Sequence, residues 1–335
     1  MKIGAFGEVM LRLTPPEYFL LEQTDQLRMA FTGTGVNLLS NLDRFGQTTQ
    51  LMTKLPDNRL GEAAAANLRK LGIDLDYTGF SGDHLGSYFA ELGYGARPTQ
   101  VTYQNRRNSA FSLSQAAGYS LEEFVAEMDL IHICGISLSL TETTAETAQK
   151  LAEIAHTAGK AVCFDFNFRP SLNDAPGQRE MMKERYLAIL PYADIVFGTV
   201  RDLVELLDYD TKPTDKTSET LLIQRFIKEY QLTWFVGTER QYDGQQHHLR
   251  GKLYTAEAFI TSESYPLQIL DRIGAGDAYA AGILLGFAEG WSLEYTVKFA
   301  TANAVLAHTI AGDVPLTTKK TVEHFLTAPH VDLLR

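Results

Sequence analysis

The sequence has few of the features that mark secreted, membrane or nucleic-acid-binding proteins. Its 335 residues include only 2 cysteines, Cys134 and Cys163, and no CxxC pair, so neither a disulfide framework nor a zinc site is expected. The longest nearly apolar run, residues 278–288, is about half the length that a membrane-spanning helix needs, roughly 20 residues. Acidic residues outnumber basic ones by 41 to 30, a formal net charge of −11, which disfavours binding to nucleic-acid phosphates.

The remaining composition is that of an ordinary globular protein. Hydrophobic residues make up 45% and charged residues 21% of the chain, which argues against disorder. The two cysteines lie inside short apolar segments, as is typical of buried thiols in a reducing cytoplasm. We therefore expect a cytoplasmic protein that binds neither nucleic acid nor membrane. Its length corresponds to about two domains, or to one large α/β domain with an accessory part.

Short apolar runs alternate with longer helix-like segments through the middle of the chain. In order, these runs and segments are 131–134, 143–158, 161–165, 178–190, 195–197, 223–230 and 234–236. Such alternation predicts an α/β fold with a parallel sheet covered by helices on both faces. Ligands of such sheets bind beyond the carboxyl ends of the strands, so polar residues that follow each apolar run are the first candidates for a site.

Two early regions, 11–31 and 76–109, have strand-like alternation and no long helix. We expect them to pair as a small sheet. The predicted organisation is therefore a single domain over 1–335 with a lid built from about 11–31 and 76–109. Because a lid sheet has open edges, it is a natural contact for a homodimer or a higher homo-oligomer.

The strongest local motif is DRIGAGD at 271–277, followed by a good helix sequence at 278–289. Gly274, Ala275 and Gly276 have little or no side chain, so their backbone N–H groups can approach an anion at the positive end of the helix. Asp277 falls in the first helical turn, where the dipole keeps a carboxylate ionised and able to accept a proton. This combination fits phosphoryl transfer to an alcohol. The alternative is a glycine-rich helix start in which the aspartate is only a cap.

Other glycine motifs are weaker. In the segment TGTGVN at 32–37, Gly33 and Gly35 allow a ligand close to the backbone, and the Asn37 amide suits hydroxyl groups. A tight turn followed by a helix cap is the alternative. The sequence has no GxGxxG, Walker, HExxH or GxSxG motif, so dinucleotide binding, P-loop chemistry, zinc proteolysis and serine hydrolysis are disfavoured.

One candidate arginine, Arg169, follows the apolar run 161–165. Asp165, Asn167 and Arg169 alternate toward Pro170, so we expect all three to point the same way, with Arg169 at the carboxyl edge of the sheet. There its planar fork could clamp a carboxylate or a phosphate, although a surface ion pair is the alternative.

The lid region supplies two more arginines. We expect 101–109 to be a lid strand that carries Tyr103, Arg106 and Arg107, with the two arginines facing opposite sides. Only one of them would then face a ligand. Arginines near a pocket that binds hydroxyl groups suggest that the ligand is an anionic polyol, such as a sugar acid.

The motif at 271–277 resembles the signature Asp-Thr-x-Gly-Ala-Gly-Asp of the ribokinase-like (PfkB) carbohydrate kinases. The resemblance covers nearly the whole chain, because Gly7-Glu8, 33–37, 54–61 and 71–74 fall in the family's order. Arg272 in place of threonine, and the segments 165–169 and 308–313, are most similar to the 2-keto-3-deoxygluconate kinases of that family.

The resemblance implies a ribokinase-like fold, with a mostly parallel central sheet, helices on both faces and a small β-sheet lid. It implies ATP-dependent phosphorylation of 2-keto-3-deoxygluconate at its 6-hydroxyl, giving 2-keto-3-deoxy-6-phosphogluconate. Mg²⁺ would bridge the phosphates, and a monovalent cation such as K⁺ would lie near the anion hole. The alternatives are a PfkB kinase for fructose, ribose or a deoxy-inositol acid, and a non-catalytic sugar-acid sensor on the same fold. A nicotinamide dehydrogenase is disfavoured.

The resemblance also implies roles for individual residues. Asp277 would be the catalytic base, and the anion hole would be formed by Gly274, Ala275 and Gly276. The residues implied for the sugar acid are Gly33, Gly35, Asn37, Tyr88, Tyr103, Arg106 and Arg169, with the two arginines near its carboxylate. The residues implied for the nucleotide are Asn167, Gly237, Thr238, Gly274, Gly276 and Asn303. No direct metal ligand is expected, although Asp202 could act on magnesium through water.

Three departures from the family pattern stand out. Thr32 replaces the first glycine of a Gly-Gly pair and adds a side chain beside the sugar. The family's Asn-x-x-Glu corresponds here to Thr199 and Asp202, and the nucleotide loop carries Glu239 and Arg240 in place of its second glycine. We expect these changes to alter nucleotide or substrate preference, or to reduce activity.

Overall fold

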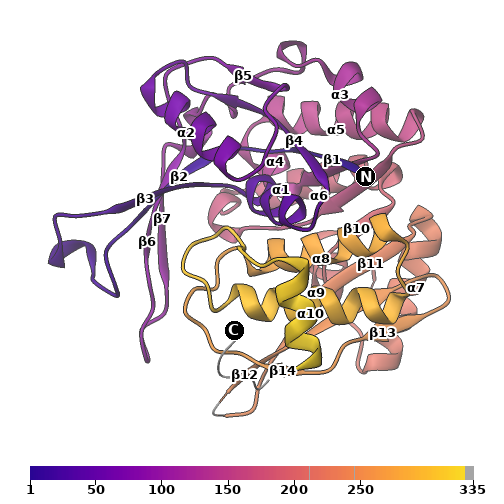
Figure 1. Cartoon of the computed structure of the whole chain (residues 1–335). Helices are drawn as coiled ribbons and strands as arrows, with labels where there is room; N and C mark the ends of the chain where they lie inside the picture. The colour runs from indigo at the N-terminus through magenta and orange to yellow at the C-terminus, as the bar shows by residue number, and fades with distance from the viewer. Residues whose placement is uncertain (211, 245, 329–335) are drawn as a thin grey trace.

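A ten-stranded sheet runs through the centre of the computed structural model, which describes residues 1–210, 212–244 and 246–328. Its strand order is β13-β12-β11-β10-β9-β8-β1-β4-β5, and β14 pairs with β12 (Figure 1). The strands are β1 (Lys2–Phe6), β4 (Thr48–Leu55), β5 (Thr78–Phe80), β8 (Leu130–Cys134), β9 (Ala161–Asp165), β10 (Ile195–Phe197), β11 (Trp234–Tyr242), β12 (His247–Tyr254), β13 (Phe259–Thr261) and β14 (Tyr265–Pro266). From β5 to β11 all neighbours are parallel, and β12 and its partners are antiparallel.

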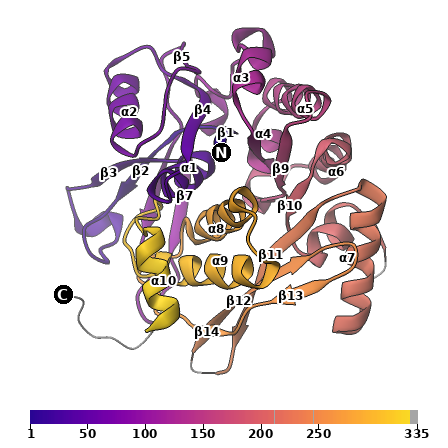
Figure 2. The ribbon, with the colours of Figure 1, turned by 45° about the vertical axis from the view of Figure 1, so that its right-hand side comes forward.

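Helices cover both faces of this sheet (Figure 2). One face packs against α1 (Thr34–Arg44), α2 (Arg59–Lys70), α8 (Ala275–Glu289), α9 (Leu293–Ala307) and α10 (Lys319–Thr327). The other face packs against α3 (Leu121–Glu127), α4 (Gly135–Leu140), α5 (Glu142–Thr157), α6 (Gln178–Ile189) and α7 (Lys216–Tyr230). Along β10, Ile195 and Phe197 enter the first core and Val196 the second, because successive strand side chains point to opposite faces. Both faces are buried, so the central strands are apolar throughout.

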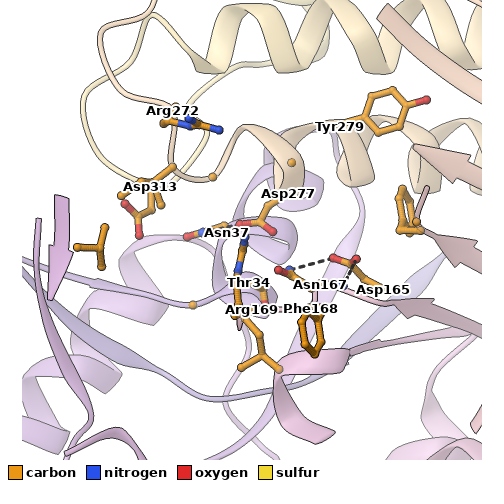
Figure 3. A pocket seen from close by; sticks show the side chains of 18 of the residues that line it. Thr34, Asn37, Asp165, Asn167, Phe168, Arg169, Arg272, Asp277, Tyr279 and Asp313 are labelled. Atoms are coloured by element: carbon orange, nitrogen blue, oxygen red, sulfur yellow. Dashed lines mark hydrogen bonds between the residues drawn. The ribbon is translucent and has the colours of Figure 1, made fainter. Parts of the chain in front are cut away.

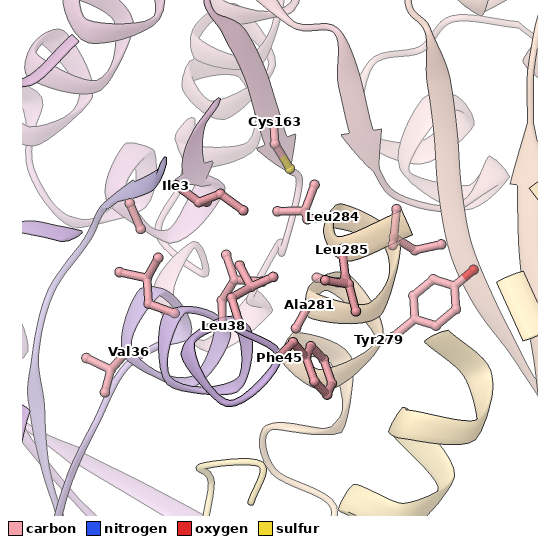
Figure 4. Packing of buried hydrophobic residues seen from close by; sticks show 14 of the residues in the cluster. Ile3, Val36, Leu38, Phe45, Cys163, Tyr279, Ala281, Leu284 and Leu285 are labelled. Atoms are coloured by element: carbon pink, nitrogen blue, oxygen red, sulfur yellow. The ribbon is translucent and has the colours of Figure 1, made fainter. Parts of the chain in front are cut away.

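The apolar segment 278–288 lies in α8, in the first core (Figure 4). A Cβ added at Gly282 would lie 2.5 Å from the Ala300 Cα, so this glycine allows α8 and α9 to pack closely. This enclosure explains why α8 is hydrophobic on all sides. Within the described residues, no helix is both long and apolar enough to cross a membrane.

A separate four-stranded sheet projects from the body in Figure 1. Its order is β3-β2-β6-β7, formed by β2 (Met10–Thr14), β3 (Arg28–Thr32), β6 (Ser87–Glu91) and β7 (Gln100–Gln104). The predicted fold class, a mostly parallel sheet between helices plus a small second sheet, is confirmed. The description of the chain as one kinase domain with a lid from about 11–31 and 76–109 stays a prediction.

Two local expectations were wrong. The lid strand ends at Gln104, because Asn105 has a left-handed φ of 48° and a 3₁₀ turn, Arg106–Asn108, follows. Strand β9 ends at Asp165, because Asn167 has a φ of 38°. Asparagine tolerates this region because its side chain bonds locally. Strand alternation therefore says nothing about where Arg106 or Arg169 points.

Candidate active site

A cavity of about 860 Å³ lies at the carboxyl edge of the parallel sheet, between the body and the small sheet. Its walls come from the loop after β1, the β3–α1 junction, the small sheet, the ends of β9, β10 and β11, and the start of α8. Figure 3 shows Asn37, Asp165, Asn167, Arg169 and Asp277 converging on it. The cavity is therefore where ligands of parallel sheets are expected.

Helix α8 begins at this cavity and carries Asp277 in its first turn. The preceding Gly274 has a φ of 81°, and a Cβ there would lie 1.8 Å from the Asp313 carbonyl oxygen, so only glycine fits. Gly276 has open space around its Cα. The first N–H groups of a helix have no intrahelical acceptor, so this end of α8 can receive an anion.

The Asp277 carboxyl group is held by Asn37, whose Nδ2 donates to Oδ2 at 2.7 Å. Burial raises the pKa of Asp277 to about 8, repulsion from Asp165 adds to this effect, and the Asn37 hydrogen bond opposes it. Burial likewise raises the pKa of Asp165 to about 6, against the attraction of Arg169 and a hydrogen bond from Asn167. The site therefore holds two carboxyl groups that titrate near neutrality, as acid–base chemistry requires.

Arg106 and Glu8 form a buried ion pair in the cavity wall, with Nε of the arginine 2.8 Å from Oε1 of the glutamate. The guanidinium lies 4.8 Å from the centre of the Tyr103 ring, a cation–π contact. In the described structure Nη1 of Arg106 and Oε2 of Glu8 are buried without a hydrogen-bond partner. Because buried polar atoms are rarely left unpaired, both are available to a polar ligand.

Arg107 does not reach the cavity, because its Nη2 donates to the Leu172 carbonyl at 2.6 Å. The structure thus brings Arg106, and not its neighbour, to the site, and Arg169 also lines it. Tyr88 and Gly33 are in the same wall.

Another part of the cavity wall is formed by Gly237 and Thr238 in β11, and by Thr199 and Asp202 after β10. A Cβ at Gly237 would lie 2.3 Å from the Gly198 carbonyl oxygen, so the close approach of the two strands requires glycine. Both the backbone N–H and the hydroxyl of Thr199 donate to Asp202 Oδ2, at 2.7 and 2.8 Å. Burial raises the pKa of Asp202 despite these bonds.

The two residues of β11 that depart from the family pattern, Glu239 and Arg240, lie in different surroundings. Arg240 lines the cavity, with its Nη2 2.9 Å from Nε2 of the buried His308. Burial, with repulsion from Arg272, lowers the pKa of Arg240 to about 10. Glu239 does not line the cavity, and it pairs with Lys252 at 3.1 Å. Of the two substitutions, only the arginine can meet a ligand.

Three residues that the resemblance implied do not line the cavity: Gly35, Ala275 and Asn303. Asn303 is fully buried, and its Nδ2 donates at 2.7 Å to Asn41 Oδ1 and at 2.7 Å to the Ala278 carbonyl. Its amide therefore joins three helices and is not free for a nucleotide. Gly35 faces the sheet, where an added Cβ would lie 3.3 Å from the Ala5 Cβ.

Sequence reasoning assigned no role to Glu8 or Asp313, both of which line the cavity. Glu8 follows strand β1, so it could have been predicted as a site residue from the rule that ligands bind beyond the carboxyl ends of parallel strands. Asp313 lies in a loop after the last long helix and follows no strand, so the only sequence signal for it was its place in the segment 308–313, which carries part of the family resemblance. Among the described residues, no group of three or more His, Cys, Asp or Glu side chains is arranged to hold a metal ion.

The chain is similar to carbohydrate kinases along almost its whole length. Residues 2–317 match the family described as pfkB family carbohydrate kinase. A crystal structure of a candidate 2-keto-3-deoxygluconate kinase from Enterococcus faecalis is 60% identical, with a TM-score of 0.98 over 100% of this chain and 99% of that one. The 2-dehydro-3-deoxygluconokinase of Thermotoga maritima is 27% identical, with a TM-score of 0.91 over 98% and 99%. A 2-dehydro-3-deoxygalactonokinase of Haloferax volcanii is 28% identical over 97% of this chain and 96% of its own.

Proposed function

Because the chain belongs to the PfkB family of carbohydrate kinases, we propose that it transfers the γ-phosphoryl group of ATP to the 6-hydroxyl of 2-keto-3-deoxygluconate. The observation that carries the proposal is the position of Asp277 in the first turn of α8, in a cavity that also holds Arg106 and Arg169. The names of the relatives from Enterococcus and Thermotoga support the choice of sugar acid.

In the proposed reaction, the sugar O6 attacks the γ-phosphorus and its proton passes to the Asp277 carboxylate. The new O–P bond forms as the bond to the β-phosphate oxygen breaks, and ADP leaves. The backbone N–H groups at Gly274 and Gly276, which line the cavity, receive the charge on the phosphoryl oxygens. The hydrogen bond from Asn37 favours the ionised base, in opposition to burial.

The carboxylate of the sugar acid pairs with arginine in this proposal. Nη1 of Arg106 is buried and has no partner among the described residues, and Arg169 lies on the same cavity. Glu8 already neutralises part of the Arg106 charge, so the second arginine supplies the excess positive charge. Gly33, Asn37, Tyr88 and Tyr103 supply the rest of the sugar pocket.

The nucleotide lies toward β11, against Gly237, Thr238 and Asn167. Magnesium bound to the triphosphate neutralises the charge that develops during transfer. Mg²⁺ commonly keeps several waters and few protein ligands, and Asp202 is a carboxyl group of this cavity wall. Asp202 would act on the ion through water, and the hydrogen bonds from Thr199 would orient the Asp202 carboxylate.

Three further features belong to the proposal. A monovalent cation such as K⁺ near the anion hole is tested by turnover with and without K⁺. A homodimer or higher homo-oligomer through the small sheet is supported by the open edges of β3 and β7 and by the exposed Met29. A cytoplasmic location is supported by two buried, unbridged cysteines.

The test is ADP release from Mg-ATP with 2-keto-3-deoxygluconate, its galacto epimer, gluconate, fructose and ribose. The proposal expects a strong preference for a keto-deoxy acid. Preference for a neutral sugar would retain the kinase and contradict the assignment of the arginines. Thermal stabilisation by a sugar acid without any ADP release would instead favour a non-catalytic sensor.

A further inference from the structure

A continuous chain of side-chain contacts links the small sheet to Asp277. Arg12 of β2 donates to Oδ1 of Asp313, and Oδ2 of Asp313 lies 2.8 Å from the Thr32 hydroxyl. The Thr32 hydroxyl is 2.9 Å from Asn37 Oδ1, and Asn37 Nδ2 is 2.7 Å from Asp277 Oδ2. Arg12, Thr32, Asn37 and Asp313 are all buried. Figure 3 shows Asn37 beside Asp277, with Asp313 on the neighbouring loop.

The two ends of the Asn37 amide have different surroundings. In the described structure Oδ1 meets only the Thr32 hydroxyl, and Nδ2 meets only Asp277. An amide can turn over and exchange its oxygen for its nitrogen, so the donor at Oδ1 decides which end faces the carboxylate. Thr32 is the sole described donor to Oδ1.

Asp313 does not depend on Thr32 in the same way. It also accepts hydrogen bonds from Arg12 and from the Tyr88 hydroxyl. A hydroxyl has a single hydrogen, so Thr32 donates to one of its two neighbours at a time. Because Arg12 and Tyr88 already serve Asp313, the Thr32 hydrogen can be given to Asn37.

We propose that Thr32 is a positioning residue, whose hydroxyl fixes the orientation of the Asn37 amide so that its N–H group faces Asp277 and keeps the carboxylate able to accept a proton. The inference rests on the proposed role of Asp277 as the base. It gives a function to Thr32, which sequence analysis marked only as an added side chain beside the sugar.

Other charged groups also face Asp277 and set the background for this effect. Asp165 at the end of β9 and Asp313 raise the pKa of Asp277, and Arg169 lowers it. The buried thiol of Cys134 is also close enough to interact with Asp277 electrostatically. A change at Thr32 removes none of these groups, but Asp313 loses its contact with the hydroxyl and keeps those with Arg12 and Tyr88. The contribution of the amide is therefore isolated by comparison with a background that lacks Asn37.

The experiment compares Thr32→Val with Thr32→Ser, using the pH profile of kcat with Mg-ATP and 2-keto-3-deoxygluconate. Valine keeps the shape and loses the donor, so the amide can present its oxygen to Asp277 and disfavour the carboxylate. The rising limb should then move to higher pH by about 0.5–1 unit, the equivalent of one ordinary hydrogen bond. Serine keeps the donor and should restore the original profile.

A double-mutant cycle tests whether Thr32 acts through Asn37. In an Asn37→Ala background, Thr32→Val should leave the position of the rising limb unchanged, because no amide remains to be oriented. A shift of the same size in both backgrounds would overturn the inference, as would superimposable profiles for the valine variant and the unmodified enzyme. Thermal melting of each variant shows whether the fold is retained, and the serine variant controls for packing.

Failure of the inference and failure of the proposed function give different results. If Asp277→Asn retains turnover, the proposed base is wrong and the inference fails with it. If Asp277→Asn is inactive and the Thr32→Val profile does not move, only the inference is wrong.

Discussion

Replacing Arg12 by methionine should destabilise the protein strongly. The Arg12 side chain is 3% exposed and pairs with Asp271 at 2.7 Å and with Asp313, which are 0% and 4% exposed. Methionine fills similar space without charge, so both carboxylates lose their cationic partner in a buried place. Removing one member of a buried ion pair typically costs about 3–5 kcal/mol. A protein of this kind has only about 5–15 kcal/mol of stability, so this is a large fraction.

The measurement is urea-induced unfolding, followed by the fluorescence of Trp234 and Trp291. The matched control is Arg59→Met, because the Arg59 side chain is 94% exposed and its pair with Glu62 lies on the surface. Exposed pairs contribute about 0–1 kcal/mol, so this variant should unfold near the midpoint of the unmodified protein. Midpoints are compared together with the slopes, because a changed slope reports a change in the surface exposed on unfolding.

A variant in which the whole cluster of Arg12, Asp271 and Asp313 is uncharged distinguishes the loss of charge pairing from the loss of packing. Adding Asp271→Asn and Asp313→Asn to Arg12→Met removes the uncompensated charges, so a large part of the lost stability should return. If Arg12→Met unfolds within about 1 kcal/mol of Arg59→Met, the cluster does not stabilise the fold and the reasoning from buried charge is refuted. Failure of the neutral variant to recover would assign the loss to packing alone.

Four further outcomes follow from the site. Asp277→Asn should lower kcat by about 10²–10⁴-fold with the fold intact, and full turnover would contradict the proposed base. In the unmodified enzyme kcat/KM should rise with pH through about 8, because burial raises the pKa of Asp277 and only its ionised form accepts a proton; a profile flat from pH 6 to 9 would count against this. Because the pKa of Asp277 is raised in the folded protein, the folded state of the unmodified protein loses stability relative to the unfolded chain as pH rises from about 4 to about 8. The melting temperature of Asp277→Asn should therefore rise relative to that of the unmodified protein over that range. Arg169→Ala should raise KM for the keto-deoxy acid and leave any turnover of neutral sugars unchanged, and equal effects on both would remove Arg169 from carboxylate binding.

The main sheet could be predicted because its information is local. Strands buried on both faces, such as β8, β9 and β10, are short and mostly apolar, and the long helix α5 between β8 and β9 is amphipathic. The antiparallel strands β12 to β14 follow no such alternation and were not predicted. The predicted strand at 101–109 failed because one left-handed residue, Asn105, ends it, and backbone dihedrals of single asparagines are not visible in a polarity pattern.

The candidate site likewise has a part that local sequence predicted and a part that it did not. The start of α8 could be predicted, because Gly274, Gly276 and Asp277 are consecutive and helix geometry fixes their relation. The Arg106–Glu8 pair spans 98 positions and the Arg12–Asp313 pair spans 301, so neither follows from local spacing. The sequence also does not show which way a residue of a buried helix faces. Helix α9 is buried on several sides, so Asn303 could have faced either the cavity or the core.

Thr32 shows why a departure from a family pattern is interpretable only with its partners. Judged from the sequence, a threonine in place of glycine adds bulk beside the sugar. In the structure its hydroxyl lies between Asp313 and Asn37, at 2.8 and 2.9 Å, so its polar group is turned toward the surroundings of Asp277. The threonine is accommodated because Asp313 and Asn37 supply polar partners for a buried hydroxyl, which would otherwise lower stability. Thr32→Gly should therefore not restore the family arrangement by itself, because it leaves Asn37 Oδ1 without the only donor that the described structure provides.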